Sequence, residues 1–384
     1  MASMSSRERV LTTLDHQEPD RVPLDIGGGY SESIVVEGYE RLKRRLNVSG
    51  ETQFLDSTQR VARLDESVMQ RLGSDFRAVV TRAPANWTPP PSEPGTRVDK
   101  WGVTYRQVFY GEGCYYWDMV GHPLAEATIE DLERFPWPDP LDPGLTAGLA
   151  DEARDLHEGT EYAITGDPGF QMLWEQAFPL RGYEQLLMDI AEGSEFVDAL
   201  LSRILELNMA ATGRFLDVVG PHIDIIRASD DLATQRGPLM SPTMYRRVLW
   251  PYLARYLDFV KSRTDARVFF HTCGNVTDLI DDLVEAGVDA INPVQVSAMP
   301  DTSELKARFG HKVSFWGGID TQHVMPAGSV DDVETEVRRR IRDLAPGGGY
   351  VLAAVHNLQP DVPPENILAM ADAARRLGTY PIRD

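Results

Sequence analysis

One short run of the chain brings together two side-chain types that bind metals. Residues 268–270 are Val, Phe and Phe, as in a buried strand, and His271 and Cys273 follow directly. Side chains at i and i+2 of an extended chain point to the same side, so one imidazole nitrogen and one thiolate sulfur can face a single point. Nitrogen and sulfur are the ligands that zinc prefers. We therefore predict a zinc site at His271 and Cys273.

A catalytic zinc site has three protein ligands and an open fourth position. His356 is the best candidate for the third ligand, and a role for it as an acid or base stays open. Asp230 or Asp231 could fill the open position at rest. His323 is a weaker candidate, and we expect Cys114, the second cysteine, to be an ordinary small residue.

The elements that must position these residues alternate regularly along the chain. Eight predicted strands, most of them followed by a helical pattern, lie at residues 22–26, 76–80, 162–165, 223–227, 267–270, 288–291, 312–315 and 350–353. Eight such repeats favour a (β/α)8 TIM barrel, in which catalytic residues lie at the C-terminal ends of the strands. The polar residues expected at that mouth are Asp25, Arg77, Asp167, Asp230, Asp231, His271, Cys273, Asn292, Gln295, Asp320, His356 and Asn357.

The stretch 81–143 interrupts this alternation. It contains five prolines between positions 84 and 94, a β-like run at 100–110 and the aromatic cluster Tyr115, Tyr116 and Trp117. Large aromatic side chains need a surface on which to pack. We therefore predict a single barrel domain over residues 1–384, in which 81–143 is a lid-like excursion with a hairpin, inserted after the second strand.

Composition and charge exclude several classes of protein. The 384 residues suffice for one large barrel, and 42% hydrophobic and 25% charged residues are typical of globular proteins. A formal net charge of −21 opposes binding to nucleic acid or to an anionic membrane. Two cysteines cannot make a disulfide framework, and neither a signal peptide nor a transmembrane run is seen. We therefore expect a cytoplasmic location.

Three segments resemble the uroporphyrinogen decarboxylase superfamily. They are residues 7–23, with Arg-Glu-Arg-Val and Glu-Pro-Asp-Arg-Val-Pro, residues 237–252, with Gly-Pro-Leu-Met-Ser-Pro and Pro-Tyr, and residues 361–366. The resemblance covers most of the chain and implies a (β/α)8 barrel. True decarboxylases carry Arg-Gln-Ala-Gly-Arg near the N-terminus to hold porphyrinogen carboxylates. Here residues 25–29 are Asp-Ile-Gly-Gly-Gly, which argues against a porphyrinogen substrate.

A second branch of this superfamily contains zinc methyltransferases that work with corrinoid proteins. They carry His-x-Cys after the fifth strand and a further Cys after the eighth. His271 and Cys273 match the first two ligands, whereas His356 stands in place of the last. The resemblance implies transfer of a methyl group from a small O- or N-methylated donor to a corrinoid (cobalamin) on a separate protein. Exchange of a thiolate for imidazole would make the zinc a stronger Lewis acid, suited to polarising the donor heteroatom.

Further roles follow from this expectation. Asp230 or Asp231 would orient the donor or supply a proton, and Trp174 with Tyr115, Tyr116 and Trp117 would form an apolar wall. The predicted substrate-binding residues are Asp167, Trp174, Tyr116 and Asn357. The alternatives are a decarboxylase-like lyase that acts on a small carboxylated substrate, a non-catalytic partner of a methyl-transfer system and, least favoured, a zinc hydrolase. The oligomeric state stays open.

Overall fold

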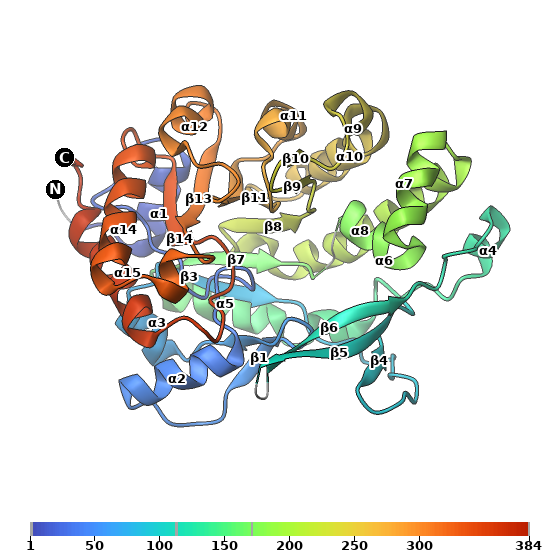
Figure 1. Ribbon diagram of the computed structural model, residues 1–384, viewed down its shortest axis with the longest axis horizontal. Helices are drawn as coiled ribbons and strands as arrows, with labels where there is room; N and C mark the ends of the chain where they lie inside the picture. The colour runs from blue at the N-terminus through green and yellow to red at the C-terminus, as the bar shows by residue number, and fades with distance from the viewer. Residues whose placement is uncertain (1–2, 112–113, 170–171, 383–384) are drawn as a thin grey trace.

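The computed structural model describes residues 3–111, 114–169 and 172–382. Its centre is a sheet of seven strands, which are β3 (Phe76–Val80), β7 (Ala163–Asp167), β8 (Ile225–Ser229), β11 (Arg267–His271), β12 (Ala290–Val294), β13 (Ser314–Ile319) and β14 (Tyr350–Ala354). All neighbours are parallel, in the spatial order β14-β13-β12-β11-β8-β7-β3, and helices surround the curved sheet (Figure 1). The predicted TIM-barrel architecture is confirmed.

Segment 22–26 occupies the eighth strand position of the barrel. It was predicted to be a strand, but it does not form a regular one. Leu24 forms an isolated parallel bridge with Leu352 of β14. On its other side, the Leu24 carbonyl accepts a bond of 2.9 Å from the Asp75 amide, next to β3. The Leu24 amide donates to the Asp75 carboxylate instead of to a backbone oxygen. Pro23 has no N–H to extend the ladder, so single bridges join the two edges of the sheet.

Helix α1 (Ser6–Leu14) closes the N-terminal end of the barrel. The helix is capped by Ser5, whose hydroxyl accepts the Glu8 amide. Its buried Val10 and Leu14 pack in one cluster with inward-facing residues of all seven strands, Phe76, Ala163, Ile225, Phe269, Ala290, Trp316, Val351 and Ala353. The barrel interior is thus a packed core, and the opposite, C-terminal mouth is where ligands would bind.

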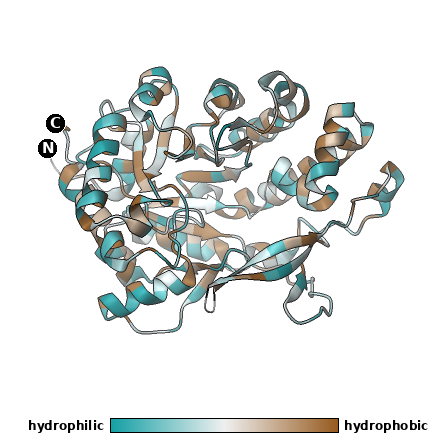
Figure 2. Ribbon diagram, in the orientation of Figure 1, coloured by the Kyte–Doolittle hydropathy of each residue, from teal (hydrophilic) through white to brown (hydrophobic). Residues whose placement is uncertain are grey.

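Amphipathic helices cover the outside of the sheet, and Figure 2 shows their mixed hydrophilic and hydrophobic faces. Ser194, Ser241 and Ser329 accept backbone amides where α8, α9 and α14 begin. The covering helices are α2 (Val36–Leu46), α3 (Glu66–Leu72), α5 (Leu149–Gly159), α8 (Glu195–Val219), α9 (Pro242–Val248), α10 (Trp250–Lys261), α11 (Ile280–Ala286), α12 (Thr302–Phe309), α14 (Val330–Leu344) and α15 (Pro364–Leu377). Within the described ranges, no helix has both the length and the apolar character needed to cross a membrane.

Shorter elements surround the C-terminal mouth. Helix α6 follows β7 and continues into α7, and the small β9–β10 pair follows β8. Their bounds are α6 (Trp174–Arg181), α7 (Tyr183–Glu192), α13 (Val324–Ala327), β9 (Ala233–Thr234) and β10 (Gly237–Pro238), with short 3-10 helices at Pro143–Thr146, Gly220–His222 and Thr277–Leu279. These elements carry the loops that form the site described below.

Between β3 and β7 lies an antiparallel sheet made of β4 (Thr96–Val98), β5 (Thr104–Gly111) and β6 (Cys114–Gly121), followed by α4 (Ile129–Arg134). The predicted hairpin is therefore present. Figure 1 shows it beside the β1–β2 pair (Gln53–Asp56 and Val61–Arg63). Arg60, next to β2, donates to the Tyr115 hydroxyl at 2.8 Å and lies 4.4 Å from the centre of its ring. The extent of the excursion as a unit and its lid function stay predictions.

Candidate metal centre and adjoining pocket

The three predicted ligand side chains lie together at the C-terminal mouth. His271 ends β11, Cys273 lies two residues later, and His356 follows β14. One ligand atom from each residue lies within 4.8 Å of the other two. The His271 Nε2 atom is 3.4 Å from the Cys273 Sγ atom, and the two imidazole ring centres are 5.4 Å apart. This group could hold a metal ion through two nitrogens and one sulfur.

Asn292 fixes the orientation of the His271 ring. The Nδ1 atom of His271 is 2.5 Å from the Asn292 Oδ1 atom, and the two residues are register partners on β11 and β12. An amide oxygen accepts only, so Nδ1 carries the proton and the Nε2 lone pair faces Cys273. Histidines that ligate metals usually donate their second ring N–H in this way. The observed residues therefore fit a metal-binding role.

Two side chains from neighbouring loops accept hydrogen bonds from the loop that carries Cys273. Its amide donates to the Asp231 carboxylate at 2.7 Å, and the next amide, that of Gly274, donates to Gln295 Oε1 at 2.7 Å. Gly274 has φ +92°, and a Cβ there would lie 2.6 Å from two backbone oxygens of β9. Only glycine fits such a position, so the direction of the chain after Cys273 is fixed.

Burial of the metal-binding group changes its protonation. Burial, with His271 as the next cause, lowers the pKa of His356 to about 4, so its imidazole is neutral at physiological pH. Burial, together with the Asp231 and Glu175 carboxylates, raises the pKa of the Cys273 thiol. A cation that bound the sulfur would displace its proton, which couples binding to pH.

The two predicted catalytic carboxylates contact backbone amides. Asp230 accepts from Trp174 N at 3.1 Å and from Glu175 N at 2.8 Å, both at the start of α6. Burial raises the pKa of Asp230 to about 7. Asp231 accepts the Cys273 amide, as described above. The observed contacts give both residues positioning roles, and their direct action on a donor stays a prediction.

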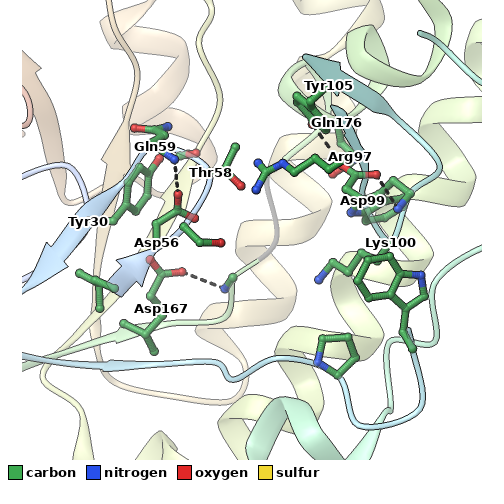
Figure 3. A pocket seen from close by; sticks show the side chains of 18 of the residues that line it. Tyr30, Asp56, Thr58, Gln59, Arg97, Asp99, Lys100, Tyr105, Asp167 and Gln176 are labelled. Carbon is green, nitrogen blue, oxygen red and sulfur yellow. Dashed lines mark hydrogen bonds between the residues drawn. The ribbon is translucent and has the colours of Figure 1, made fainter. Parts of the chain in front are cut away.

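A cavity of about 530 Å³ opens at the C-terminal mouth of the barrel, and Figure 3 shows residues that line it. It is lined by the barrel ends, the turn after β1 and the excursion. Tyr30 and Ser229 line it and connect it to His271: the Tyr30 and His271 ring centres are 6.2 Å apart, and Ser229 is the register partner of His271. His271, Cys273 and His356 do not themselves line the cavity, so Tyr30 and Ser229 lie between a molecule bound there and the metal-binding residues.

The predicted substrate-binding residues are only partly brought together. Asp167 lines the cavity, and Asn357 donates to Gln59, a lining residue, at 3.4 Å. Trp174 is 2% exposed and packs against Phe178 and Tyr183 in α6 and α7. Tyr116 is 46% exposed, and its hydroxyl donates to Gln359 at 2.7 Å. Neither Trp174 nor Tyr116 lines the described cavity.

Of two other residues expected at the mouth, Arg77 points away from it and Asp25 is buried beneath it. The Arg77 guanidinium pairs with Glu66 at 2.6 Å and lies 3.5 Å from the centre of the Tyr162 ring. Alternation along β3 explains this, because Phe76 points into the barrel and Arg77 therefore points out. Asp25 is buried, and it accepts from the Trp316 indole at 3.1 Å and from a backbone amide. The prediction that Arg77 lies at the mouth is therefore wrong.

Sequence reasoning assigned no role to a buried charged group at the mouth. Arg227, in β8, donates to Glu32 at 2.7 Å, and its Nε atom is 3.7 Å from Asp167. A Cβ on Gly29 would lie 2.3 Å from Arg227 Nη1, so a larger residue there would displace the guanidinium. The available signal was an arginine inside an apolar strand, since buried arginines are almost always paired.

Glu175 was also missed. The Ser229 hydroxyl donates to its Oε2 atom at 2.7 Å, and burial, followed by Asp231 and Asp230, raises the pKa of its carboxyl group well above the ordinary range. Glu175 lies in the first turn of α6, and no pattern in the sequence separates it from other helical glutamates.

Comparisons with known proteins agree with this architecture. A uroporphyrinogen decarboxylase of Hydrogenovibrio crunogenus is 26% identical over 144 residues, 37% of this chain and 39% of that protein. One of Alkalilimnicola ehrlichii is 24% identical over 279 residues, 70% of each. The chain thus spans well under half of the first of these relatives. A methyltransferase from Methanosarcina mazei has the same fold, with a TM-score of 0.66 and 18% identity over 97% of this chain and 99% of that one.

The family model described as uroporphyrinogen decarboxylase (URO-D) matches residues 172–377. This range is more than half of the 384 residues and includes His271, Cys273 and His356. The resemblance expected from the three sequence segments is confirmed, and this chain belongs to the uroporphyrinogen decarboxylase (URO-D) family.

Proposed function

We propose that the protein is a zinc-dependent methyltransferase that moves a methyl group from a small O- or N-methylated donor to a corrinoid cofactor on a partner protein. The observation that carries the proposal is the convergence of His271, Cys273 and His356 within 4.8 Å at the mouth of the barrel. The shared fold with a methyltransferase over nearly the whole chain supports it. The absence of the decarboxylase arginine pair in residues 25–29 also favours this branch.

His271 Nε2, Cys273 Sγ and His356 would hold the zinc. Bound there, zinc supplies Lewis acidity toward the heteroatom that carries the methyl group. Only one of these three ligands is a thiolate, so the centre keeps more of its positive charge than a thiolate-rich one. That charge distribution suits an ether or amine donor better than activation of a thiol.

The residues of the chain prepare this reaction in three ways. Asn292 holds the His271 proton on Nδ1, so that Nε2 is free to act as a ligand. Asp231 and Gln295 hold the amides at and after Cys273, which keeps the sulfur in place. Asp230 fixes the start of α6 and hence Glu175 beside the pocket. As the methyl group passes to the nucleophilic corrinoid of the partner protein, which would supply the electron pair of the new bond, the pair of the broken bond would stay on the heteroatom. The heteroatom would then take a proton from solvent or from Glu175.

Metal analysis and a methylation assay test the proposal. We expect about one zinc per chain, with one sulfur and two imidazole nitrogens by X-ray absorption, and methylation of free cob(I)alamin by a methoxylated donor. His271→Ala and Cys273→Ser should lose both the metal and the activity. Cys114→Ser is the matched control, because Cys114 lies in β6, away from the metal group, and it should retain both. Full methyl transfer by metal-free protein would contradict the zinc proposal.

A decarboxylase-like lyase acting on a small carboxylated substrate is the second candidate. The curated relatives named as uroporphyrinogen decarboxylases and the buried Arg227 beside the cavity favour it. It predicts release of carbon dioxide that survives removal of the metal, whereas the methyltransferase should release none. A non-catalytic partner protein would instead bind zinc without any turnover.

A further inference from the structure

The cavity has a second wall, which the excursion provides. Opposite Tyr30 and Asp167, the lining residues Arg97, Lys100 and Trp101 come from β4 and the turn that follows it. Figure 3 shows the Arg97 side chain extending across the cavity toward Thr58. The family match begins at residue 172, so this wall lies outside the matched range.

The three carboxylates of the cavity are already engaged by their own loops. Asp99 accepts two backbone amides, at 2.8 and 3.0 Å, and the Tyr105 hydroxyl at 3.1 Å. Asp56 accepts the Gln59 amide at 2.6 Å, and Asp167 accepts the Gly169 amide at 2.8 Å. Each of these acids therefore stabilises a turn.

Arg97 differs from these acids. Its Nε atom is buried and has no hydrogen-bond partner among the described residues, and the Asp56 and Asp99 carboxylates act on its guanidinium only at longer range than a hydrogen bond. The guanidinium carbon lies 4.4 Å from the centre of the Trp117 ring and 5.2 Å from that of Tyr105. Stacking on two rings holds the planar group in one orientation while its N–H fork stays available. The part of the guanidinium that lines the cavity is therefore suited to bind an anion there.

The cavity also offers apolar surfaces on which a ring could pack. Aromatic side chains and prolines contribute to the lining beside its polar residues, namely Tyr30, Trp87, Trp101, Tyr105, Pro84 and Pro89. The cavity runs from Arg97 to Tyr30 and Ser229, which adjoin His271. An aromatic ring between the two ends would place one substituent at Arg97 and another toward the metal group.

We propose that Arg97 binds the carboxylate of an aromatic substrate whose methoxy group points toward His271. This inference rests on the proposed methyltransferase function and names its donor class. The donor chemistry is consistent, because demethylation would release a phenol, whose pKa of about 10 makes it a far better leaving group than an aliphatic alcohol. The carboxylate at the other end makes a bidentate, charge-assisted pair with the guanidinium.

Calorimetric titration of the zinc-loaded protein tests this inference, with 4-methoxybenzoate and neutral methoxybenzene as the probes. Arg97→Gln should weaken 4-methoxybenzoate binding by about 10- to 100-fold, which is the effect of losing a hydrogen bond to a charged group. It should leave methoxybenzene binding nearly unchanged. Arg106→Gln is the matched control, because Arg106 is exposed on the neighbouring strand β5 and should have no effect. Arg97→Lys, which keeps the charge, should retain part of the affinity.

Two results would overturn the inference. One is wild-type protein that does not bind 4-methoxybenzoate more tightly than methoxybenzene, and the other is an Arg97→Gln variant that loses both probes equally. Thermal denaturation and the zinc content of Arg97→Gln show whether the variant is folded and loaded. The readout is binding, so a protein that selects the carboxylate without transferring methyl groups would contradict the proposed function and not the anion site.

Discussion

Both ends of the barrel contain buried charged side chains, but these side chains differ in how completely they are hydrogen-bonded. At the N-terminal end, Asp75 accepts five hydrogen bonds of 2.7–2.9 Å, from Ser6, Arg9, Leu24 and twice from Arg21. Near the same end, His16 Nδ1 and Ser314 Oγ have no hydrogen-bond partner among the described residues, and at the C-terminal mouth four buried polar atoms have none. They are Arg227 Nε, Glu32 Oε1, Asn292 Nδ2 and Asn357 Oδ1.

This difference separates stability from function. A buried carboxylate with all of its partners fixes the elements that supply them, here α1, segment 22–26 and β3. Buried polar atoms without partners destabilise a folded chain unless a ligand or water satisfies them. In barrels the N-terminal face generally serves stability and the C-terminal face chemistry. We therefore expect substitutions at the two ends to change different measurements.

The largest expected effect on stability is at Asp75. Asp75→Ala removes one of the two carboxylates that pair with the buried Arg9, the other being Asp20, and it also removes the acceptor of the Arg21 guanidinium and of the Leu24 amide. The free energy of unfolding should therefore fall by about 3–5 kcal/mol. Urea denaturation of metal-free protein measures it. Cys273→Ser, at the other end, should change the same quantity by less than about 1 kcal/mol. Equal losses at the two ends would contradict a division of stability and function between them.

An intermediate effect is expected at Asn292. Asn292→Ala removes the acceptor that orients His271, so zinc affinity should fall by about 10- to 100-fold, equivalent to about 1.4–2.7 kcal/mol of binding free energy. Competition with a chromogenic chelator measures the affinity. Gln322→Ala, which changes an exposed amide side chain, serves as the control. Unchanged zinc affinity in Asn292→Ala would show that the contact only packs the two strands.

The smallest expected effect concerns Lys306, near the N-terminal end, which donates to the Gly348 carbonyl. Burial lowers its pKa to about 8, below the value of about 10.4 in an unfolded chain. The unfolded state then binds more protons between these values, so this lysine makes stability rise with pH above about 8. Between pH 8 and 9 the gain is about 1 kcal/mol. Lys306→Met should remove this gain, and paired melting curves at both pH values would show it. An identical pH dependence in the variant would rule out Lys306 as its source.

The sequence predicted the parts of the site that depend on strand ends. His271 and His356 follow apolar runs at the ends of two strands, and the barrel topology alone then brings them to one mouth. Segment 22–26 was predicted as a strand because it is apolar. Its regular pairing is interrupted, because Pro23 has no N–H and the Leu24 amide donates to the Asp75 side chain. Such an interruption depends on a residue some 50 positions away, which local patterns cannot indicate.

The pocket side of the site was harder to predict. Trp174 was expected to form part of an apolar wall around the substrate, yet the hydrophobic effect favours its burial among Phe178 and Tyr183. The sequence analysis did not select Arg97, because its proposed anion-binding role depends on a lack of hydrogen-bond partners. Such a lack can be seen only in the folded structure. The aromatic cluster of the excursion did indicate a packed surface, and Trp117 there supports Arg97.

The irregular pairing of segment 22–26 affects how ligand binding and barrel closure are related. Segment 22–26 closes the barrel through single bridges, and the chain that leaves it carries Tyr30, Ser31 and Glu32 to the cavity and to Arg227. A ligand that orders these residues would also stabilise the contacts by which segment 22–26 connects β14 to β3. Binding and closure of the barrel are then linked equilibria, so an occupied pocket should raise the temperature at which that joint opens.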